Sequence, residues 1–100
     1  MDVIVPSEGL SYEEITVTNA VVGFTSALLL ASLQPKAAVL TLETAAIRWR
    51  VDGGNPSGTV GHLMSVGDSI VVHGPNNMPN FKAFRDTGVD GVLRVSYILA

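Results

Sequence analysis

Hydrophobic and polar residues alternate along several short stretches of the chain, which is typical of strands with one buried face. In residues 38–43 the even-numbered positions are apolar, whereas in residues 47–51 the odd-numbered positions are apolar. Because the side chains of a strand alternate with a period of two, this change of phase requires a bulge or a tight turn near residues 44–46. The pattern therefore predicts two strands separated by a local irregularity.

Turn-forming residues separate further short strands. Gly, Pro, Asn and Asp are concentrated in residues 52–58 and 74–77 and again in residues 86–91. Between these clusters lie apolar or alternating runs in residues 69–73, 81–85 and 92–99. Six to eight short strands joined in this way predict an all-β fold, a single-domain β-sandwich or jelly roll.

The apolar positions that share one face across these strands form the predicted core. They are Ile47, Trp49, Val51, Ile70, Val72, Leu93, Val95 and Tyr97. The last strand is also partly apolar on its opposite face, so we expect it to be covered on both sides or to lie at a subunit interface. Three glycines, Gly53, Gly67 and Gly91, are predicted to occupy turns that need a positive φ angle.

Residues 15–34 carry no charge, but they do not have the pattern of a membrane-spanning helix. Such a helix needs about 20 mainly apolar residues, and the continuous apolar part is shorter and is interrupted by Gly, Ser and Thr. We expect strands buried on both faces, or one strand followed by a short helix at residues 26–33.

The first 14 residues contain four acidic residues and no basic one, with Pro6 and Gly9 interrupting any regular element. They predict a short acidic N-terminal arm ahead of a β-sandwich domain of residues 15–100. The arm is either a frayed terminus or a segment that pairs with a neighbouring subunit. It lacks the basic start and apolar run of a secretory signal.

Composition narrows the classes of function. The chain has 100 residues, of which 47% are hydrophobic and only 15% are charged, against roughly 25% charged in an ordinary domain. This balance favours a small module that associates with other proteins, and it disfavours an enzyme. A net charge of −3 argues against a nucleic-acid partner. The absence of cysteine excludes disulfides and thiolate chemistry.

No motif for catalysis or cofactor binding is present. The two histidines, His62 and His73, are eleven residues apart and have no third ligand at a suitable spacing, so we expect no metal site. The sequence contains no phosphate-binding glycine motif and no nucleophile elbow. The acidic loops around Asp52 and at residues 86–90 are explained by ordinary Asx turns rather than by calcium. No cofactor is therefore expected.

The triplet Arg48-Trp49-Arg50 is the most distinctive local feature. In a strand, both arginines project to one face and could bind carboxylates of a partner. The alternative is an ion pair within the chain, for which the acidic candidates are Glu43, Asp52 and Asp86. The candidate partner contacts are therefore Arg48 and Arg50, together with Glu13 and Glu14 of the arm.

The segment AVLTLETAAIRWRVDG at residues 38–53 resembles a segment in small structural proteins of tailed bacteriophage particles. The pattern continues through Pro56, the Gly61-His62-Leu63 triplet, residues 67–70, Phe81 and the closing DGVLRVSY of residues 90–97. The resemblance covers roughly residues 21–97, and its motifs are turns and strands rather than catalytic residues.

The resemblance implies a virion structural protein, and we expect a cement or decoration protein on the capsid surface. Such a protein would bind the major capsid protein and stabilise the shell, and we expect a homotrimer. A neck or tail component is the alternative within the same class. A carbohydrate- or ligand-binding β-sandwich is the alternative of another class, with Trp49, Tyr12 and Tyr97 as stacking platforms. Neither a nucleic-acid nor a membrane partner is expected.

Overall fold

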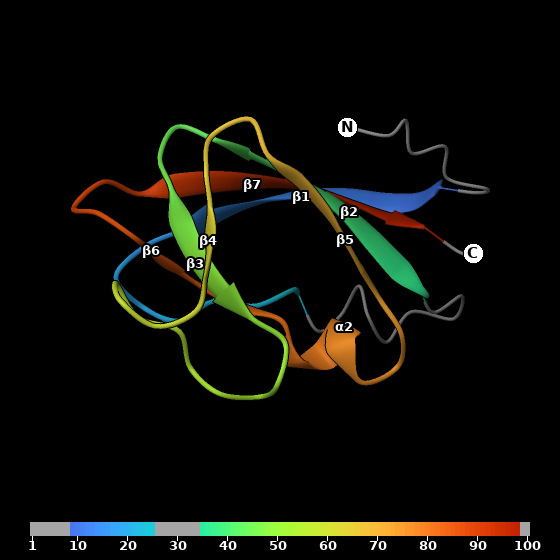
Figure 1. The fold of residues 1–100 in the computed structure, drawn as a ribbon. Coiled ribbons are helices and arrows are strands. Elements are labelled where there is room, and N and C mark those ends of the chain that lie inside the picture. The colour runs from blue at the N-terminus through green and yellow to red at the C-terminus, as the bar shows by residue number, and fades with distance from the viewer. Residues whose placement is uncertain (1–8, 26–34, 99–100) are drawn as a thin grey trace.

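Seven strands in two antiparallel sheets account for nearly all regular structure in the computed structural model, which describes residues 9–25 and 35–98 (Figure 1). The larger sheet has the order β1-β7-β2-β5, with bounds Gly9–Val17, Gly91–Ile98, Ala37–Glu43 and Ser69–His73. The smaller sheet has the order β4-β3-β6, with bounds His62–Met64, Ile47–Arg50 and Lys82–Arg85. One helical turn, α2 at Asn77–Asn80, lies between β5 and β6.

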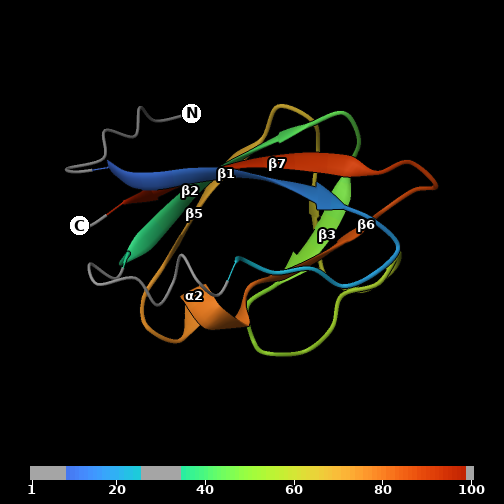
Figure 2. The ribbon, with the colours of Figure 1, turned by 180° about the vertical axis from the view of Figure 1, so that it is seen from behind.

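The two sheets pack face to face around one hydrophobic core, so the domain is an all-β sandwich (Figure 2). Leu40 and Val95 of the larger sheet and Ile47 and Met64 of the smaller sheet belong to the same buried cluster. The two predicted arrangements were a sandwich and a jelly roll. The described residues form four plus three antiparallel strands in two packed sheets, which is a sandwich arrangement.

The predicted change of phase lies where the chain crosses from one sheet to the other. The chain leaves the larger sheet after Glu43 and enters the smaller sheet at Ile47. Between them Thr44 has a φ angle of 80°, and the Ala45 amide donates to the Glu43 carbonyl at 3.0 Å. This tight turn confirms the irregularity expected at residues 44–46. It reverses the parity of the inward-facing positions because each sheet presents its own face to the core.

Gly91 differs from the other two predicted turn glycines. Gly53 and Gly67 have φ angles of 86° and 91°, as predicted. Gly91 is not among the residues with positive φ and is buried at the start of β7, so that prediction is wrong. A Cβ atom there would lie 2.7 Å from the Ala45 carbonyl oxygen and 2.7 Å from Ile47 Cγ2. The glycine is required by close packing rather than by its backbone angles.

The predicted arm boundary after residue 14 is also wrong, because it falls inside a strand. β1 pairs with β7 in regular register from Ser11 to Val17, with Glu13 opposite Val95 and Ile15 opposite Leu93, and the register shifts between Gly9 and Ser11. Residues 9–14 therefore belong to the sheet, and residues 1–8 lie outside the described residues. β1 is buried on only one face, since Ile15 is buried and Thr16 is exposed.

The segment after β1 leaves the larger sheet. Residues 18–25 cross to the smaller sheet, where Val22 forms a bridge with Ala83 of β6. The helix predicted at residues 26–33 lies outside the described residues. Within the described residues, no helix is long and apolar enough to span a membrane.

Five of the eight predicted core residues are fully buried, namely Ile47, Val72, Leu93, Val95 and Tyr97. The other three, Trp49, Val51 and Ile70, are half-buried and pack against the core. The Trp49 ring packs against His62 and Phe81, with centroid distances of 4.8 Å and 6.2 Å. Trp49 therefore lies at the border of the core rather than at its centre.

Candidate functional site

The outer face of the larger sheet is the broadest regular surface among the described residues. Strand alternation and the observed register place fourteen side chains on it: Tyr12, Glu14 and Thr16 of β1, Val92, Arg94, Ser96 and Ile98 of β7, Ala37, Val39, Thr41 and Glu43 of β2, and Ser69, Val71 and His73 of β5. Ala37 and Ile98, at one end of this face, are buried. Tyr12 is 53% exposed and Val71 is 39% exposed. We call this set the outer face.

The outer face contains two carboxylates and one guanidinium group, which pair with one another and leave a net charge of −1. Arg94 lies between Glu14 and Glu43, with Nη1 2.5 Å from Glu14 Oε2 and Nε 2.9 Å from Glu43 Oε2. Arg94 Nη1 also donates to the Tyr12 hydroxyl at 3.0 Å. The hydrogen bonds to Tyr12 and Glu43, together with the charges of Glu14 and Glu43, raise the pKa of Arg94 above its usual value. Glu14, a predicted partner contact, is thus engaged within its own sheet.

Glu13, also a predicted partner contact, points to the opposite side of β1. Its carboxylate accepts a hydrogen bond from the Tyr97 hydroxyl and two bonds from Thr25, at 2.5 Å from Oγ1 and 3.2 Å from the amide. Burial and the hydrogen bond to Glu13 raise the pKa of Tyr97. Glu13 therefore joins β1, β7 and the segment that follows β1. The sequence indicates this inward position of Glu13, because the alternation of β1 places it on the same face as Ile15 and Val17.

The outer side of the smaller sheet contains Arg48 and Arg50, which project together as predicted. Arg48 pairs with Asp86 of the chain, with 2.8 Å between Nε and Oδ1, and it also donates to the Gly61 carbonyl at 3.3 Å. Leu63, which lies opposite Arg48 in the register, is 53% exposed. Arg48 therefore forms an ion pair within the chain, which was the predicted alternative to a contact with a partner.

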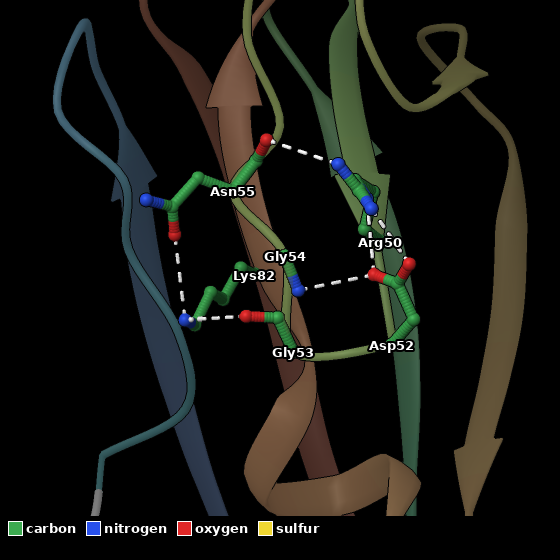
Figure 3. A network of polar contacts seen from close by, with 6 residues as sticks. All are labelled: Arg50, Asp52, Gly53, Gly54, Asn55 and Lys82. Atoms are coloured by element: carbon green, nitrogen blue, oxygen red, sulfur yellow. Dashed lines mark hydrogen bonds and ion pairs between the residues drawn. The ribbon is translucent and has the colours of Figure 1, made fainter.

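Arg50 forms a two-pronged ion pair with Asp52 (Figure 3). Arg50 Nε lies 3.0 Å from Asp52 Oδ1, and Nη2 lies 2.6 Å from Oδ2. The Gly54 amide donates to the same carboxylate at 3.1 Å. These hydrogen bonds, that of Arg50 first, lower the pKa of Asp52 from 3.8 to about 2. The carboxylate is held by the strand that precedes it and by the loop that follows.

Lys82 of β6 holds the other side of the same loop (Figure 3). Its ammonium donates to the Gly53 carbonyl at 3.1 Å and to Asn55 Oδ1 at 3.4 Å, while Arg50 Nη1 donates to the Asn55 carbonyl at 3.4 Å. The loop oxygens thus contact cationic groups of the chain itself.

The two histidines do not form a site with each other. His62 lies on β4 of the smaller sheet and stacks on Trp49, whereas His73 ends β5 of the larger sheet. Among residues 9–25 and 35–98, no three His, Asp or Glu side chains are grouped closely enough to hold a metal ion.

Three aromatic residues were predicted as platforms on which a sugar could stack. The prediction is wrong for Tyr97, because its side chain is fully buried. Tyr12 is exposed and Trp49 is half-buried, and they lie on different sheets. The described residues therefore do not gather the three rings into one carbohydrate site.

Comparisons with known protein families, with curated proteins and with solved structures found no match to this chain.

Proposed function

We propose that this chain is a structural protein of a tailed bacteriophage particle, and specifically a cement or decoration protein on the capsid surface. In this proposal the outer face of the larger sheet binds the major capsid protein and stabilises the shell. A neck or tail position is the other location that the sequence resemblance allows.

The observation that carries the proposal is the chemistry of the outer face. Glu14, Arg94 and Glu43 are already paired with one another, and the other side chains are small, β-branched, hydroxylated or aromatic apart from His73. When such a face is buried against another protein, each of these charges keeps an oppositely charged neighbour, which reduces the cost of removing the cluster and its net charge of −1 from water. The central parts of protein interfaces are depleted in charge for the same reason.

The placement of the resembling segment is consistent with a structural role. Residues 38–53 form β2, the Thr44 turn, β3 and the start of the loop held by Arg50 and Lys82. This segment joins the two sheets. It consists of two strands, the turn by which the chain passes from one sheet to the other, and the start of a loop held by ion pairs and hydrogen bonds. A framework of this kind presents a rigid face, which a cementing protein needs.

The test is a pair of matched substitutions. Ser96 lies exposed on the outer face, in the central strand β7, and Ser65 lies exposed beside the smaller sheet. Ser96→Arg should abolish rebinding to phage particles from which the protein has been stripped, because it adds bulk and a further charge to the interface. Ser65→Arg should bind as well as the parent protein, and both variants should melt like it.

The functional readout is the heat resistance of the particle. Particles restored with the parent protein or with Ser65→Arg should survive heating that inactivates stripped particles, and particles treated with Ser96→Arg should not. Equal survival of stripped and complete particles would contradict the cementing role. Copy number in purified virions separates the two locations, since a shell protein is present in far more copies than a neck ring.

A further inference from the structure

We propose that copies of this chain associate head to tail through the two edges of the larger sheet, with β1 of one copy pairing with β5 of the next. The partner is a second copy of the chain, and repetition of the contact closes a ring. The inference goes beyond the proposed function because it involves no shell protein. It can fail while a monomer still binds the shell.

The backbone amides and carbonyls of β5 alternate between the side that faces β2 and the opposite side. Two hydrogen bonds flank its ladder with β2: the Leu42 amide donates to the Asp68 carbonyl, and the Gly74 amide donates to the Lys36 carbonyl, each at 3.1 Å. In an antiparallel ladder, the residues bonded to the neighbouring strand alternate with residues whose amide and carbonyl point the other way. The even-numbered residues of β5 are therefore bonded to β2.

The odd-numbered residues of β5, Ser69, Val71 and His73, consequently direct their amides and carbonyls away from β2. Among the described residues, the one further contact of these groups is a hydrogen bond from Asn77 Nδ2 to the His73 carbonyl at 3.2 Å. β5 also contains no Lys, Asp, Glu or Pro, the residues that usually protect an exposed edge. Its edge is suited to accept another strand.

β1 forms the opposite edge of the sheet, and with nine residues it is longer than the five-residue β5. The same alternation, carried across β2 and β7 in the observed register, places the amides and carbonyls of Tyr12, Glu14 and Thr16 on its free side. The side chains of these residues lie on the outer face, as do those of the odd-numbered residues of β5. Joining the two edges therefore continues the outer face from one copy to the next.

Strand direction also favours this contact. Each neighbouring pair in β1-β7-β2-β5 is antiparallel, so β1 and β5 run in opposite directions. A copy rotated about an axis along the strands presents its β1 antiparallel to β5, and the sheet continues with its pattern unchanged.

The charges of the two edges do not oppose the contact. Glu13 of β1 points to the inner side of the sheet and Glu14 pairs with Arg94, while exposed Lys36 lies next to the end of β5, where its carbonyl accepts the Gly74 amide. Because the contact joins two different edges, each copy keeps one edge for the next copy, and the contact repeats until a ring closes. The expected particle in solution is a trimer or a larger ring.

The experiment measures absolute mass by light scattering after size exclusion. The parent protein should have three times the chain mass of 10.5 kDa, or 31.5 kDa, or a higher multiple. Val71→Pro removes an outward amide of β5, and Thr16→Pro removes an outward amide of β1, so each variant should be monomeric. Edge strands accept proline where the amide faces outward, so both variants should keep a cooperative melt.

Mixing the two variants tests the head-to-tail arrangement itself. Val71→Pro retains an intact β1 and Thr16→Pro retains an intact β5, so the mixture should form a complex of twice 10.5 kDa, or 21.0 kDa. A monomeric or dimeric parent protein, a ring that survives in either variant, or a mixture that stays monomeric would each overturn the inference. Should a proline variant not fold, Val71→Lys and Thr16→Lys replace them, with Val89→Lys on an exposed loop as the matched control.

Discussion

Gly91→Ala is the substitution for which the structure gives the most direct expectation. The added Cβ would lie 2.7 Å from the Ala45 carbonyl oxygen, 2.7 Å from Ile47 Cγ2 and 3.3 Å from Leu42 Cδ1. Contacts below 3.0 Å essentially never occur, so a neighbour has to move. The Ala45 carbonyl cannot move alone, because it belongs to the crossing turn in which Thr44 already has a positive φ angle.

The expected cost follows from this crowding. Inserting one extra carbon into a well-packed core typically costs about 1–3 kcal/mol. Two contacts are too short, and one of them is with backbone, so we expect about 2–3 kcal/mol. For a 100-residue domain this corresponds to a fall in Tm of roughly 10–20 °C. It is also a large fraction of the roughly 5–15 kcal/mol by which small domains are stable.

Urea unfolding followed by Trp49 fluorescence and thermal unfolding followed by circular dichroism measure this loss. The matched control is Gly88→Ala, where a Cβ would meet no atom within 4 Å and where φ is not positive. That variant should be neutral or stabilised by up to about 1 kcal/mol, because alanine restricts the unfolded chain. A Gly91→Ala protein within about 0.5 kcal/mol of the parent would refute the packing argument.

Three further predictions concern single side chains. Trp49→Ala should lower the free energy of unfolding in urea by about 2 kcal/mol. This is less than the roughly 3–5 kcal/mol expected for a fully buried aromatic residue, because the Trp49 ring is half-buried. A loss above about 4 kcal/mol would show that Trp49 belongs to the core. The pKa of Asp52 falls from 3.8 to about 2 on folding, so the stability that its carboxylate contributes is present above pH 3.8 and is lost as the pH falls towards 2. Asp52→Asn should therefore flatten the acid limb of the curve of stability against pH. An unchanged acid limb would contradict the pairing of Asp52 with Arg50. Tyr97→Phe should cost about 1–2 kcal/mol at neutral pH through the lost bond to Glu13. Folding raises the pKa of Tyr97 above 10.0, so the parent should lose stability as the pH rises past that value and Tyr97→Phe should lose less; equal alkaline limbs would show that the hydroxyl does not stay protonated on folding.

Local alternation predicted much of the fold. The strands near residues 38–43, 47–51 and 69–73 were predicted because each has a period of two and ends in turn-forming residues. The irregularity at residues 44–46 was also predicted, since two runs of opposite phase cannot share one regular strand. The first strand was missed, because an acidic stretch containing Gly9 suggested an arm rather than an element of the sheet.

The candidate surface was harder to predict from sequence. Glu13 and Glu14 are neighbours of identical chemistry, yet one joins Tyr97 and Thr25 beneath the sheet and the other pairs with Arg94 on the outer face. The difference depends on the register between β1 and β7, whose paired residues are about 80 positions apart in the chain. No local pattern contains that register.

The sequence by itself determined the all-β class, the turns, the low charge and the inward positions of most strands, because these depend on neighbouring residues and on a period of two. Only the tertiary structure decided the strand order β1-β7-β2-β5, the pairing of Arg48 with Asp86 and the packing that requires Gly91. These features arise where segments distant in sequence meet, and their free energy depends on which strand edges and faces come together. The free sides of β1 and β5 follow from the same long-range pairing.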